Sequence, residues 1–278
     1  MVRSPLFVHM VVKNEDRFIW YAVNSVLPFA DKILIFDTGS RDATLKIIDC
    51  FKDDRLEYKK RSIKSPADIS KLRQEQIEKT KSDWFWVVDG DEIYPEALSR
   101  EIISLISSEE DDELEGIVVG RYDLLGDIYH YQDDSAGTYD LFNKRGHFAL
   151  RLINKKNIPG LYVKGIYPYE GYYDRKGIEI IHHSANKFRF TQGKLFHAMY
   201  LSRSSLGLSL IDTYHRDKQK IERGKRFSKD TVYPEVFNFS HPACVPTVTN
   251  KRSFLYEILA LFITPVKIIK RLVWKMIG

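Results

Sequence analysis

The chain has 278 residues, of which 44% are hydrophobic and 13% aromatic. That content suffices for a substantial core, which excludes an intrinsically disordered protein and allows one large domain with additions or at most two domains. The formal net charge is only +5, and the basic residues do not form the concentrated stripe that is typical of nucleic-acid-binding proteins. We therefore expect no nucleic-acid partner.

The chain has two cysteines, Cys50 and Cys244, which lie far apart in the sequence. Their number and spacing argue against a disulfide framework and against a cysteine-based zinc site, and they suit a reducing compartment. The N-terminus lacks the long apolar run and the small-residue cleavage site of a signal peptide. No run of about 18 or more uncharged apolar residues marks a membrane span. We therefore expect a protein of the cytoplasmic side.

The first hundred residues alternate between strand-like and helix-like patterns. Predicted strands are 6–12, 32–36, 56–59 and 84–88, and predicted helices are 16–27, a segment that begins at about 42, 68–81 and a segment after Pro95. Short apolar strands separated by helices indicate a mainly parallel sheet that is covered by helices on both faces. The sequence therefore predicts an α/β fold.

Beyond the first hundred residues the pattern is less regular. The acidic run 109–113 is interpreted as a solvated loop, and residues 116–120 resume the sheet. Further predictions are short strands near 149–153 and 178–181, polar helices at about 190–226 and a proline-punctuated loop region at 227–250. The second part of the chain is thus expected to extend the sheet before it becomes helical.

Two carboxylates, Asp89 and Asp91, follow the strongest predicted strand, and Gly90 separates them. In a parallel α/β sheet, ligands bind beyond the carboxyl ends of the strands. The i, i+2 spacing can aim both side chains the same way, and the glycine lets a ligand approach the backbone. Hard divalent cations bind one or two carboxylates together with phosphate oxygens. The pattern therefore favours a metal ion that bridges the protein to a diphosphate over a simple acidic turn.

A second polar segment, 37–44, directly follows another predicted strand. Asp37 can accept hydrogen bonds from a nucleobase or a ribose. Ser40 or Asp42 can cap the helix that follows, and capping alone would account for those two residues. Capping does not account for Asp37, which we interpret as a binding residue.

These segments together resemble the family-2 glycosyltransferases. The resemblance rests on residues 12–15, 25–28, 31–44 and 84–92, with Arg73 upstream of the last segment, and it covers about the first 95 residues in the family's order. It implies a Rossmann-like nucleotide-sugar transferase fold, called GT-A, and a transfer that inverts the anomeric carbon.

The resemblance also implies roles for particular residues. A divalent metal ion, Mn²⁺ or Mg²⁺, would be held by Asp89 and Asp91, and Asp89 would also adjoin the donor. Asp37 would contact the nucleobase and Arg73 the base or the diphosphate, while Asn14 joins them in the donor site. A uridine diphosphate sugar is the donor expected by analogy with the family.

The second half of the chain resembles the family less closely. Segments 150–153, 167–170 and 180–183 are similar to a subgroup pattern in which an Arg-Leu-Phe strand precedes a His-Glu pair and a later histidine. Tyr169 replaces the histidine of that pair, so only Glu170 carries over.

Inverting transfer needs a carboxylate that deprotonates the acceptor hydroxyl. Glu170 is the first candidate for this base and Asp174 the second, and an exposed loop acid is the alternative interpretation of Glu170. His183 is a candidate third metal ligand. A histidine bound to backbone in the core is the alternative for His182 or His183.

The sequence predicts a GT-A catalytic domain over 1–190, a helical and loop extension over 191–250 and a C-terminal amphipathic segment over 251–278. The acceptor is expected to be a hydroxyl of a glycan or of a lipid-linked molecule. Two alternatives remain open. A sugar-phosphate nucleotidyltransferase would show a glycine-rich loop where residues 12–16 stand, and a non-catalytic protein could retain a nucleotide-sugar site.

From Pro265 onward the hydrophobic residues recur at helical spacing. The apolar side consists of Val266, Ile269, Leu272, Val273, Met276 and Ile277, and the basic side of Lys267, Lys270, Arg271 and Lys275. Such a helix suits the headgroup region of an anionic leaflet. We therefore expect peripheral contact with the cytoplasmic face of a membrane. A helix that packs on the catalytic domain, or one that pairs two subunits, is the alternative.

Overall fold

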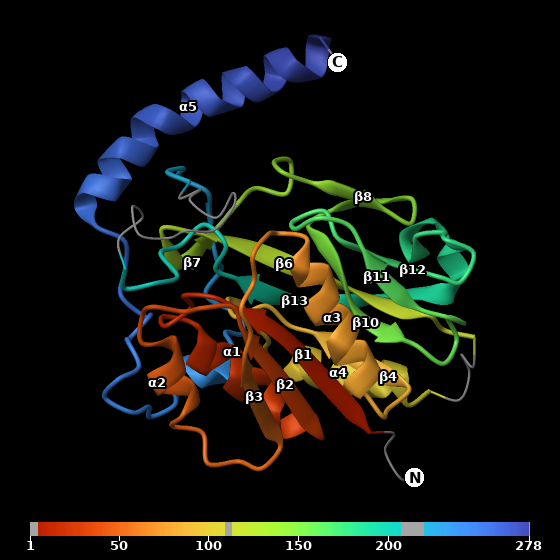
Figure 1. Cartoon of the computed structure of the whole chain (residues 1–278). Coiled ribbons are helices and arrows are strands. Elements are labelled where there is room, and N and C mark those ends of the chain that lie inside the picture. Colours follow the sequence, from red (N-terminus) through yellow and green to blue (C-terminus); the bar gives the residue numbers. More distant parts are fainter. Residues whose placement is uncertain (1–4, 109–112, 207–219, 278) are drawn as a thin grey trace.

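The computed structural model describes residues 5–108, 113–206 and 220–277, so most of the predicted acidic loop lies outside the described residues. The strands are β1 (Leu6–Val12), β2 (Lys32–Asp37), β3 (Leu56–Lys60), β4 (Trp84–Val87), β5 (Glu92–Ile93), β6 (Gly116–Leu125), β7 (Asp127–Tyr131), β8 (Tyr139–Leu141), β9 (Lys144–Gly146), β10 (Phe148–Asn154), β11 (Tyr162–Lys164), β12 (Gly171–Tyr173), β13 (Phe188–His197) and β14 (Lys225–Arg226). The α-helices are α1 (Ile19–Val26), α2 (Thr44–Ile48), α3 (Asp68–Lys79), α4 (Glu96–Ile106) and α5 (Phe254–Ile277). The main path of the large sheet has the order β14-β7-β6-β10-β4-β1-β2-β3, and α5 extends along the outside of this body (Figure 1).

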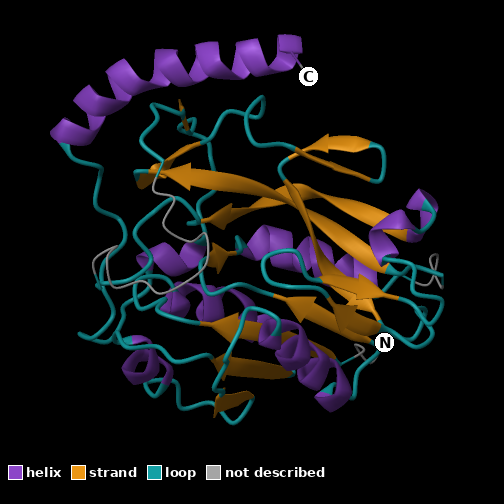
Figure 2. Ribbon diagram, turned by 45° about the horizontal axis from the view of Figure 1, so that its top comes forward, coloured by secondary structure: helices purple, strands orange, loops and turns teal. Residues whose placement is uncertain are grey.

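The half of the sheet formed by β3, β2, β1 and β4 is parallel throughout. Alternate residues of the central strand β1 point to opposite faces, as strand geometry requires. Leu6, Val8 and Met10 join the main core with α1 and α4, whereas Val11 packs with α3 on the other face. Helices therefore cover both faces (Figure 2), and the predicted α/β fold is confirmed.

The other half of the sheet is mixed. β10 pairs antiparallel with β4 and with β6, and β13 pairs parallel with β6. The helices predicted from about 190 are wrong at their start, because residues 188–197 form β13. The pairing of β13 shifts register between Phe190 and Lys194. Such an irregularity breaks the alternation by which a strand is recognised in a sequence.

Two more predictions for this half need correction. The strand predicted at 178–181 is a 3-10 helix over Ile180–His182, because a short apolar run does not distinguish strand from helix. The domain boundary predicted at 190 falls within β13, and the large sheet also includes β14 beyond it. No α-helix occurs in the described parts of 198–250.

The two cysteines are close neighbours despite their separation in the sequence. Cys50 follows α2, Cys244 lies in the segment that leads to α5, and their Sγ atoms are 3.4 Å apart. That segment is held on the body by a hydrogen bond from the hydroxyl of Tyr21 to the carbonyl of Pro246 (3.1 Å). Tertiary packing therefore brings together two cysteines that are 194 positions apart in the sequence.

The C-terminal helix α5 is longer than the segment predicted from 265 onward, since it begins at Phe254 and continues through Pro265. A proline removes one backbone hydrogen bond from a helix interior. The described part of the chain contains no helix with the length and apolar character that crossing a membrane would need. The side chains of Lys275, Met276 and Ile277 lie outside the described part.

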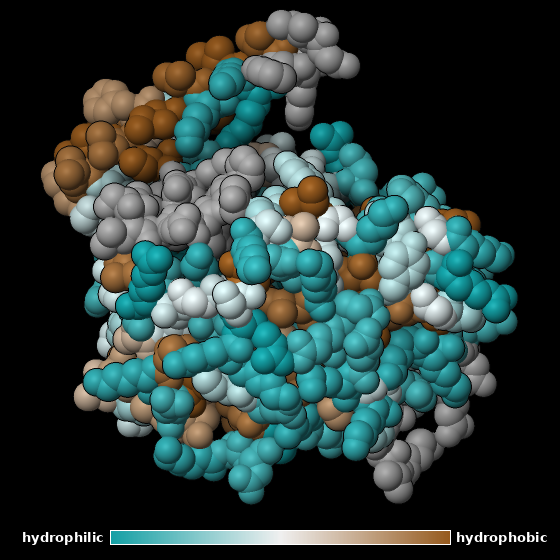
Figure 3. Space-filling model, viewed as in Figure 1, coloured by the Kyte–Doolittle hydropathy of each residue, from teal (hydrophilic) through white to brown (hydrophobic). Residues whose placement is uncertain are grey.

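The basic side of α5 faces the body. Lys267 and Arg271 both contact Glu222, with Nζ of Lys267 3.3 Å and Nη2 of Arg271 2.6 Å from its Oε1. Figure 3 shows hydrophobic residues along the side of α5 that is turned away from the body and hydrophilic residues on the side toward it. Seven apolar residues of this helix are more than half exposed to solvent: Phe254, Leu255, Leu261, Phe262, Val266, Ile269 and Leu272.

Candidate active site at the carboxyl edge of the parallel strands

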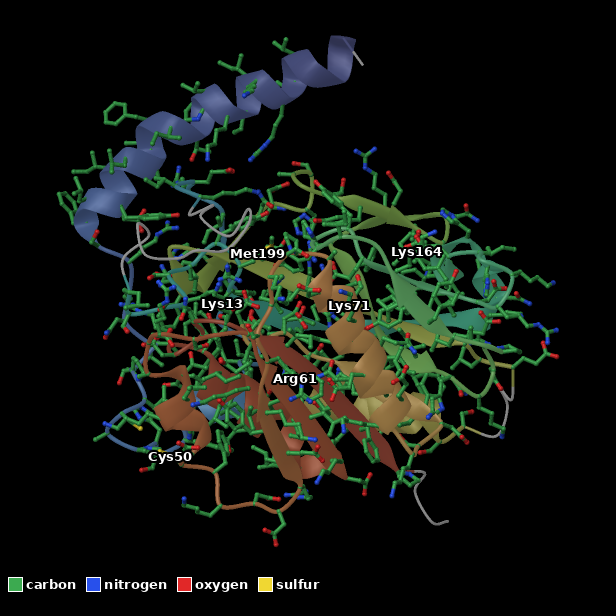
Figure 4. The ribbon with its side chains drawn as sticks, in the orientation of Figure 1. Lys13, Cys50, Arg61, Lys71, Lys164 and Met199 are labelled. Atoms are coloured by element: carbon green, nitrogen blue, oxygen red, sulfur yellow. The ribbon has the colours of Figure 1, made fainter. Side chains whose placement is uncertain are left out.

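The loops that follow β1, β2 and β4 meet at one edge of the sheet, where Lys13 is labelled in Figure 4. Val12 at the end of β1 pairs with Asp37 at the end of β2. A Cβ added at Gly90 would lie 2.9 Å from Cγ of Glu15. Glycine is therefore required for this close approach, and the Asp-Gly-Asp segment lies directly against the loop after β1.

Asp37 is buried, and its two carboxylate oxygens have different surroundings. Oδ1 accepts hydrogen bonds from the backbone N–H groups of Gly39 and Ser40, both at 3.0 Å. Oδ2 is buried and has no hydrogen-bond partner among the described residues. Because a buried polar atom without a partner costs free energy, Oδ2 is a candidate contact for a ligand.

Asn14 connects the loops after β1 and β2. Its φ of 54° is left-handed, a conformation that asparagine tolerates better than most residues. Its backbone N–H donates to Oγ of Ser40, and its Oδ1 accepts from the backbone N–H of Arg41, both at 2.8 Å. The structure therefore places Asn14, predicted as a donor contact, where it positions the Asp37 loop.

Asp89 lies between two arginines. Nη2 of Arg151, on β10, donates to Asp89 at 2.9 Å, and Nη2 of Arg73, on α3, is 3.5 Å away. Burial alone would raise the pKa of Asp89, but the two guanidinium groups outweigh burial and lower this pKa below its ordinary value. Arg151 also donates from Nε to the fully buried Glu92 at 3.0 Å. Asp89 is thus an ionised carboxylate in a cationic setting.

Asp91 is buried and contacts two other cationic side chains. Nη1 of Arg203 donates to its Oδ2 at 3.0 Å, and Nε2 of His197 lies 3.6 Å from its Oδ1. The other ring nitrogen of His197 lies 3.3 Å from Oδ1 of Asp123. Burial would lower the pKa of His197, yet Asp91 and Asp123 raise it to about 10. His197 is therefore protonated at neutral pH in this arrangement.

Glu170 belongs to the same cluster through Arg73. Its Oε1 accepts a hydrogen bond from Nε of Arg73 at 3.1 Å, and both side chains are 9% exposed. Oε2 of Glu170 and Nη1 of Arg73 are buried without a hydrogen-bond partner among the described residues. Arg73 thus links Glu170 to Asp89 and leaves two polar atoms available to a ligand.

Asp174 and His183 form a different cluster. Nδ1 of His183 is hydrogen-bonded to Glu115, and Nε2 lies 3.5 Å from Oδ2 of Asp174. Oδ1 of Asp174 accepts the backbone N–H groups of Lys176 and Ile178, at 2.8 and 2.9 Å, and so closes a turn. Both residues therefore have local structural partners.

The length of β6 separates this cluster from the Asp89–Asp91 segment. Glu115 directly precedes β6, whereas Asp123, the partner of His197, lies near its other end. Eight residues of strand span about 26 Å. The geometry does not support a metal site that joins His183 to Asp91, and it favours Glu170 over Asp174 as a residue of the site.

Three side chains of the cluster escaped the sequence predictions. Arg151 belongs to the Arg-Leu-Phe-like segment, so the resemblance did signal it without assigning it a role. The positions of His197 and Arg203 in the site depend on the pairing of β13 with β6 and β5. No local sequence pattern indicates this pairing.

Residues 7–165 match the sequence model of the family described as glycosyl transferase family 2. This span is more than half of the chain. The chain belongs to glycosyl transferase family 2. The family assignment agrees with the edge described above, since the matched span includes Asp37, Arg73, Asp89 and Asp91.

Curated proteins that are similar to this chain include the SPbeta prophage-derived glycosyltransferase SunS of Bacillus subtilis (strain 168). It is 34% identical to this chain over 86 residues, which are 31% of this chain and 19% of SunS. The SunS of Bacillus phage SPbeta matches equally. This chain therefore spans about a fifth of the length of these curated relatives.

Solved structures with a similar fold include residues 1–349 of TarS from S. aureus, at 11% identity and a TM-score of 0.46, covering 70% of this chain and 60% of that one. The same TarS fragment was solved with UDP-GlcNAc. Glucosyl-3-phosphoglycerate synthase from Mycobacterium tuberculosis, solved with Mn²⁺ and UDP-glucose, has 16% identity, a TM-score of 0.32 and 44% coverage of both chains.

Proposed function

We propose that this family-2 member is an enzyme that transfers a sugar from a nucleoside diphosphate to an acceptor hydroxyl, with inversion of the anomeric carbon. The observation that carries the proposal is one edge of the sheet at which Asp37, Asp89 and Asp91 lie with Arg73 and Arg151. A nucleotide offers hydrogen-bond donors, a diphosphate needs cations, and an attacking hydroxyl needs a carboxylate. Membership of family 2 supports this proposal.

The donor would lie across the ends of β1, β2 and β4. The unpartnered Oδ2 of Asp37 can accept a hydrogen bond from the nucleobase, and the unpartnered Nη1 of Arg73 can donate to a diphosphate oxygen. Guanidinium groups are well suited to phosphate because their donors form a planar fork. A uridine nucleotide is the form proposed here.

A divalent ion, Mn²⁺ or Mg²⁺, would be held by Asp89 and Asp91. Their carboxylate oxygens are hard ligands, and one or two of them suffice where phosphate oxygens complete the shell. Among the described residues no group of three or more His, Cys, Asp or Glu side chains is arranged to hold an ion, so the diphosphate would supply further ligands. His197, 3.6 Å from Asp91, is the histidine next to these carboxylates, and its Nε2 would have to release its proton before it could serve as the ligand predicted for His183. When bound, the ion would offset the negative charge that develops on the leaving diphosphate.

Glu170 is the proposed general base. Its Oε1 is held by Arg73, and its Oε2 is the unpartnered atom that can take the proton of the acceptor hydroxyl. General base assistance contributes roughly a hundredfold to ten-thousandfold to such reactions. Asp174 lacks this position, because its Oδ1 closes a turn at the other end of β6.

The proposed acceptor is a hydroxyl of a glycan or of a lipid-linked molecule at the cytoplasmic face of a membrane. The support is α5, whose apolar side chains are exposed and whose basic side chains face the body. A helix of this kind can insert its apolar side at the acyl boundary while its cationic side remains among the headgroups.

The test is release of nucleoside diphosphate from a panel of nucleotide sugars, beginning with UDP-GlcNAc and UDP-glucose, with Mn²⁺ or with excess chelator. We expect slow hydrolysis of one donor without acceptor and its loss with chelator. Pyrophosphate release from a nucleoside triphosphate and a sugar phosphate would instead establish a nucleotidyltransferase. Donor binding without turnover in the presence of acceptor-containing membranes would establish a non-catalytic protein.

A further inference from the structure

A cavity of about 370 Å³ lies between α5 and the hairpin that β8 and β9 form. Three cationic side chains line it: Arg145 from β9, and Lys270 and Arg271 from α5. The hydroxyl-bearing residues Ser135 and Thr138 also line it, and no acidic side chain is among the lining residues. The cavity is thus chemically suited to an anion.

Two of the three cations retain unneutralised charge. Nε of Arg145 donates to the neutral Oγ1 of Thr138 at 3.0 Å, and within the described residues neither Arg145 nor Lys270 forms an ion pair. Arg271 differs, because Glu222 neutralises it. Arg145 and Lys270 can therefore both donate to a bound anion, and a guanidinium with hydroxyl neighbours is a common phosphate-binding arrangement.

Side-chain contacts connect the cavity to the candidate active site. The carbonyl of Ala136, at the cavity, accepts a hydrogen bond from Nε2 of His147 at 2.6 Å, and Nδ1 of His147 lies 3.0 Å from Asp123. Asp123 in turn contacts His197, the neighbour of Asp91. The cavity is therefore linked to the candidate active site through His147 and Asp123.

The orientation of α5 supplies the reason for a lipid ligand. Its exposed apolar side faces away from the body, while Lys270 and Arg271 line the cavity on the inner side. In a helix that lies at a membrane surface, the apolar side reaches the acyl boundary and the polar side remains at headgroup level. The cavity would then be at the level of the lipid phosphates.

We propose that this cavity binds the phosphate group of a membrane lipid, with Arg145 and Lys270 as its principal ligands. The proposal rests on the membrane contact in the proposed function. It goes further because it places the lipid headgroup in a defined cavity. One of the residues that line this cavity, Arg145, is on β9 and not on α5. General attraction of a basic helix to an anionic surface requires no contribution from Arg145.

The experiment compares Arg145→Gln, Lys270→Gln and the matched control Lys251→Gln in the full-length protein. Lys251 is an exposed lysine just before α5 and does not line the cavity. Flotation with phosphatidylglycerol vesicles at low salt is the readout, and phosphatidylcholine vesicles give the background. Each cavity substitution should weaken binding about fivefold or more, on the scale of one basic residue at an anionic surface, and Lys251→Gln should have a clearly smaller effect. Unchanged flotation of Arg145→Gln, or an equal loss in Lys251→Gln, would overturn the proposal.

A second experiment, carried out without vesicles, distinguishes binding of a lipid phosphate from binding of free phosphate. Calorimetric titration with inorganic phosphate should show at most weak binding, on a millimolar scale. If inorganic phosphate binds tightly and Arg145→Gln abolishes that binding without changing flotation, the lipid assignment is refuted. Donor hydrolysis by the wild-type protein reports on the proposed transferase independently, because it needs neither vesicles nor the cavity.

The pair of thiols at Cys50 and Cys244 carries a second inference. The two Sγ atoms are 3.4 Å apart although the residues are 194 positions apart, and these are the two cysteines of the chain. We infer that the pair is a redox modification site that forms an intramolecular disulfide with a small-molecule disulfide as oxidant. The thiolate of one cysteine attacks one sulfur of the oxidant and forms a mixed disulfide, and the other half of the oxidant leaves as a thiol. The second cysteine then attacks the mixed disulfide and releases the other thiol, so that two protein protons end on the two thiols.

The bond would join the end of α2 to the segment that leads to α5. Peptide mapping after treatment with oxidised glutathione should give one linked peptide that contains both cysteines, and dithiothreitol should reverse it. The melting temperature should rise on oxidation, because a crosslink over a long loop restricts the unfolded chain. Cys244→Ser should show neither change. Stable glutathione adducts on the wild-type protein without a Cys50–Cys244 peptide would refute the inference.

Discussion

The two halves of the large sheet place their functional residues by different means. In the parallel half, Asp37 and Asp89 follow strands whose ends are adjacent because parallel neighbours run together. In the mixed half, Arg151 reaches the same edge on β10, an antiparallel strand with a register shift. His197 reaches it on β13, a strand from later in the chain that pairs parallel with β6. The first arrangement follows from strand order, whereas the second depends on long-range pairing. Asp89 is thus paired with Arg151 of the mixed half as well as with Arg73 of α3, while Asp37 is held by backbone N–H groups of its own loop.

The largest effect is expected in the parallel half, at Asp91. Asp91→Asn keeps the shape of the side chain but removes the charge that a divalent ion would bind. Metal-dependent donor hydrolysis should fall by at least about a thousandfold, since several kcal/mol of charge stabilisation would be lost. Circular dichroism should show an intact fold.

Asp91→Ala is expected to lower the stability of the fold more than Asp91→Asn does. Asp91 is buried against Arg203 and His197, so alanine removes a carboxylate partner from each cation and leaves Arg203 only Glu15 and His197 only Asp123 among their ion-pair partners in the described residues. Breaking a buried pair costs about 3–5 kcal/mol, which should lower the melting temperature measurably. Full hydrolysis by either variant would remove Asp91 from the mechanism.

Glu170 precedes β12, outside the large sheet, and contacts Arg73 of α3. Glu170→Gln should slow transfer to an acceptor by roughly a hundredfold or more, because general base assistance is lost. The amide oxygen can still accept the hydrogen bond from Arg73, so donor affinity should change little. Asp174→Asn is the matched control, and we expect near-normal transfer from it. A dead Asp174→Asn beside a fast Glu170→Gln would reverse the assignment.

A comparison of His197 with His183 tests which of the two clusters contributes to metal binding. His197→Gln should reduce the affinity for Mn²⁺ and donor about tenfold or more, as removal of a ligand or of a neighbouring support group typically does. His183→Gln should leave that affinity within about twofold, since its contacts are Glu115 and Asp174. Titration of Mn²⁺ in the presence of UDP measures both. Equal losses would mean that the two clusters act together.

The smallest effect on the chemistry should come from α5. The helix is anchored through Tyr256, whose hydroxyl donates to the carbonyl of Lys220 at 2.9 Å, so removal of residues 265–278 retains this anchor. Donor hydrolysis should stay within about twofold, because the truncation removes no residue of the carboxyl edge. Flotation with anionic vesicles should be lost. A truncated protein that still floats would locate membrane binding elsewhere.

The strand-end chemistry of the parallel half could be predicted from the sequence because periodicity and chain order determine it. Asp37, Asp89 and Asp91 were found in this way, and Arg73 was indicated by the resemblance to family 2. The cations Arg151, His197 and Arg203 received no predicted role, since each is brought to the edge by strand pairing or by the loop after β13. His183 was predicted as a ligand because it follows a short apolar run, but that run is a 3-10 helix at the far end of β6. The amphipathic pattern of α5 was visible in the sequence, while the direction in which its basic side faces was not.

Calorimetric titration of UDP tests the central claim most directly, namely that the carboxyl edge of the parallel strands is a metal-dependent nucleotide site. The wild-type protein should bind UDP with Mn²⁺ present and lose about tenfold or more in affinity when a chelator replaces the metal, because the ion bridges the diphosphate to Asp89 and Asp91. Asp91→Asn should bind UDP with the same weak affinity under both conditions. Metal-independent binding by the wild-type protein, or metal-dependent binding that survives in Asp91→Asn, would contradict the account.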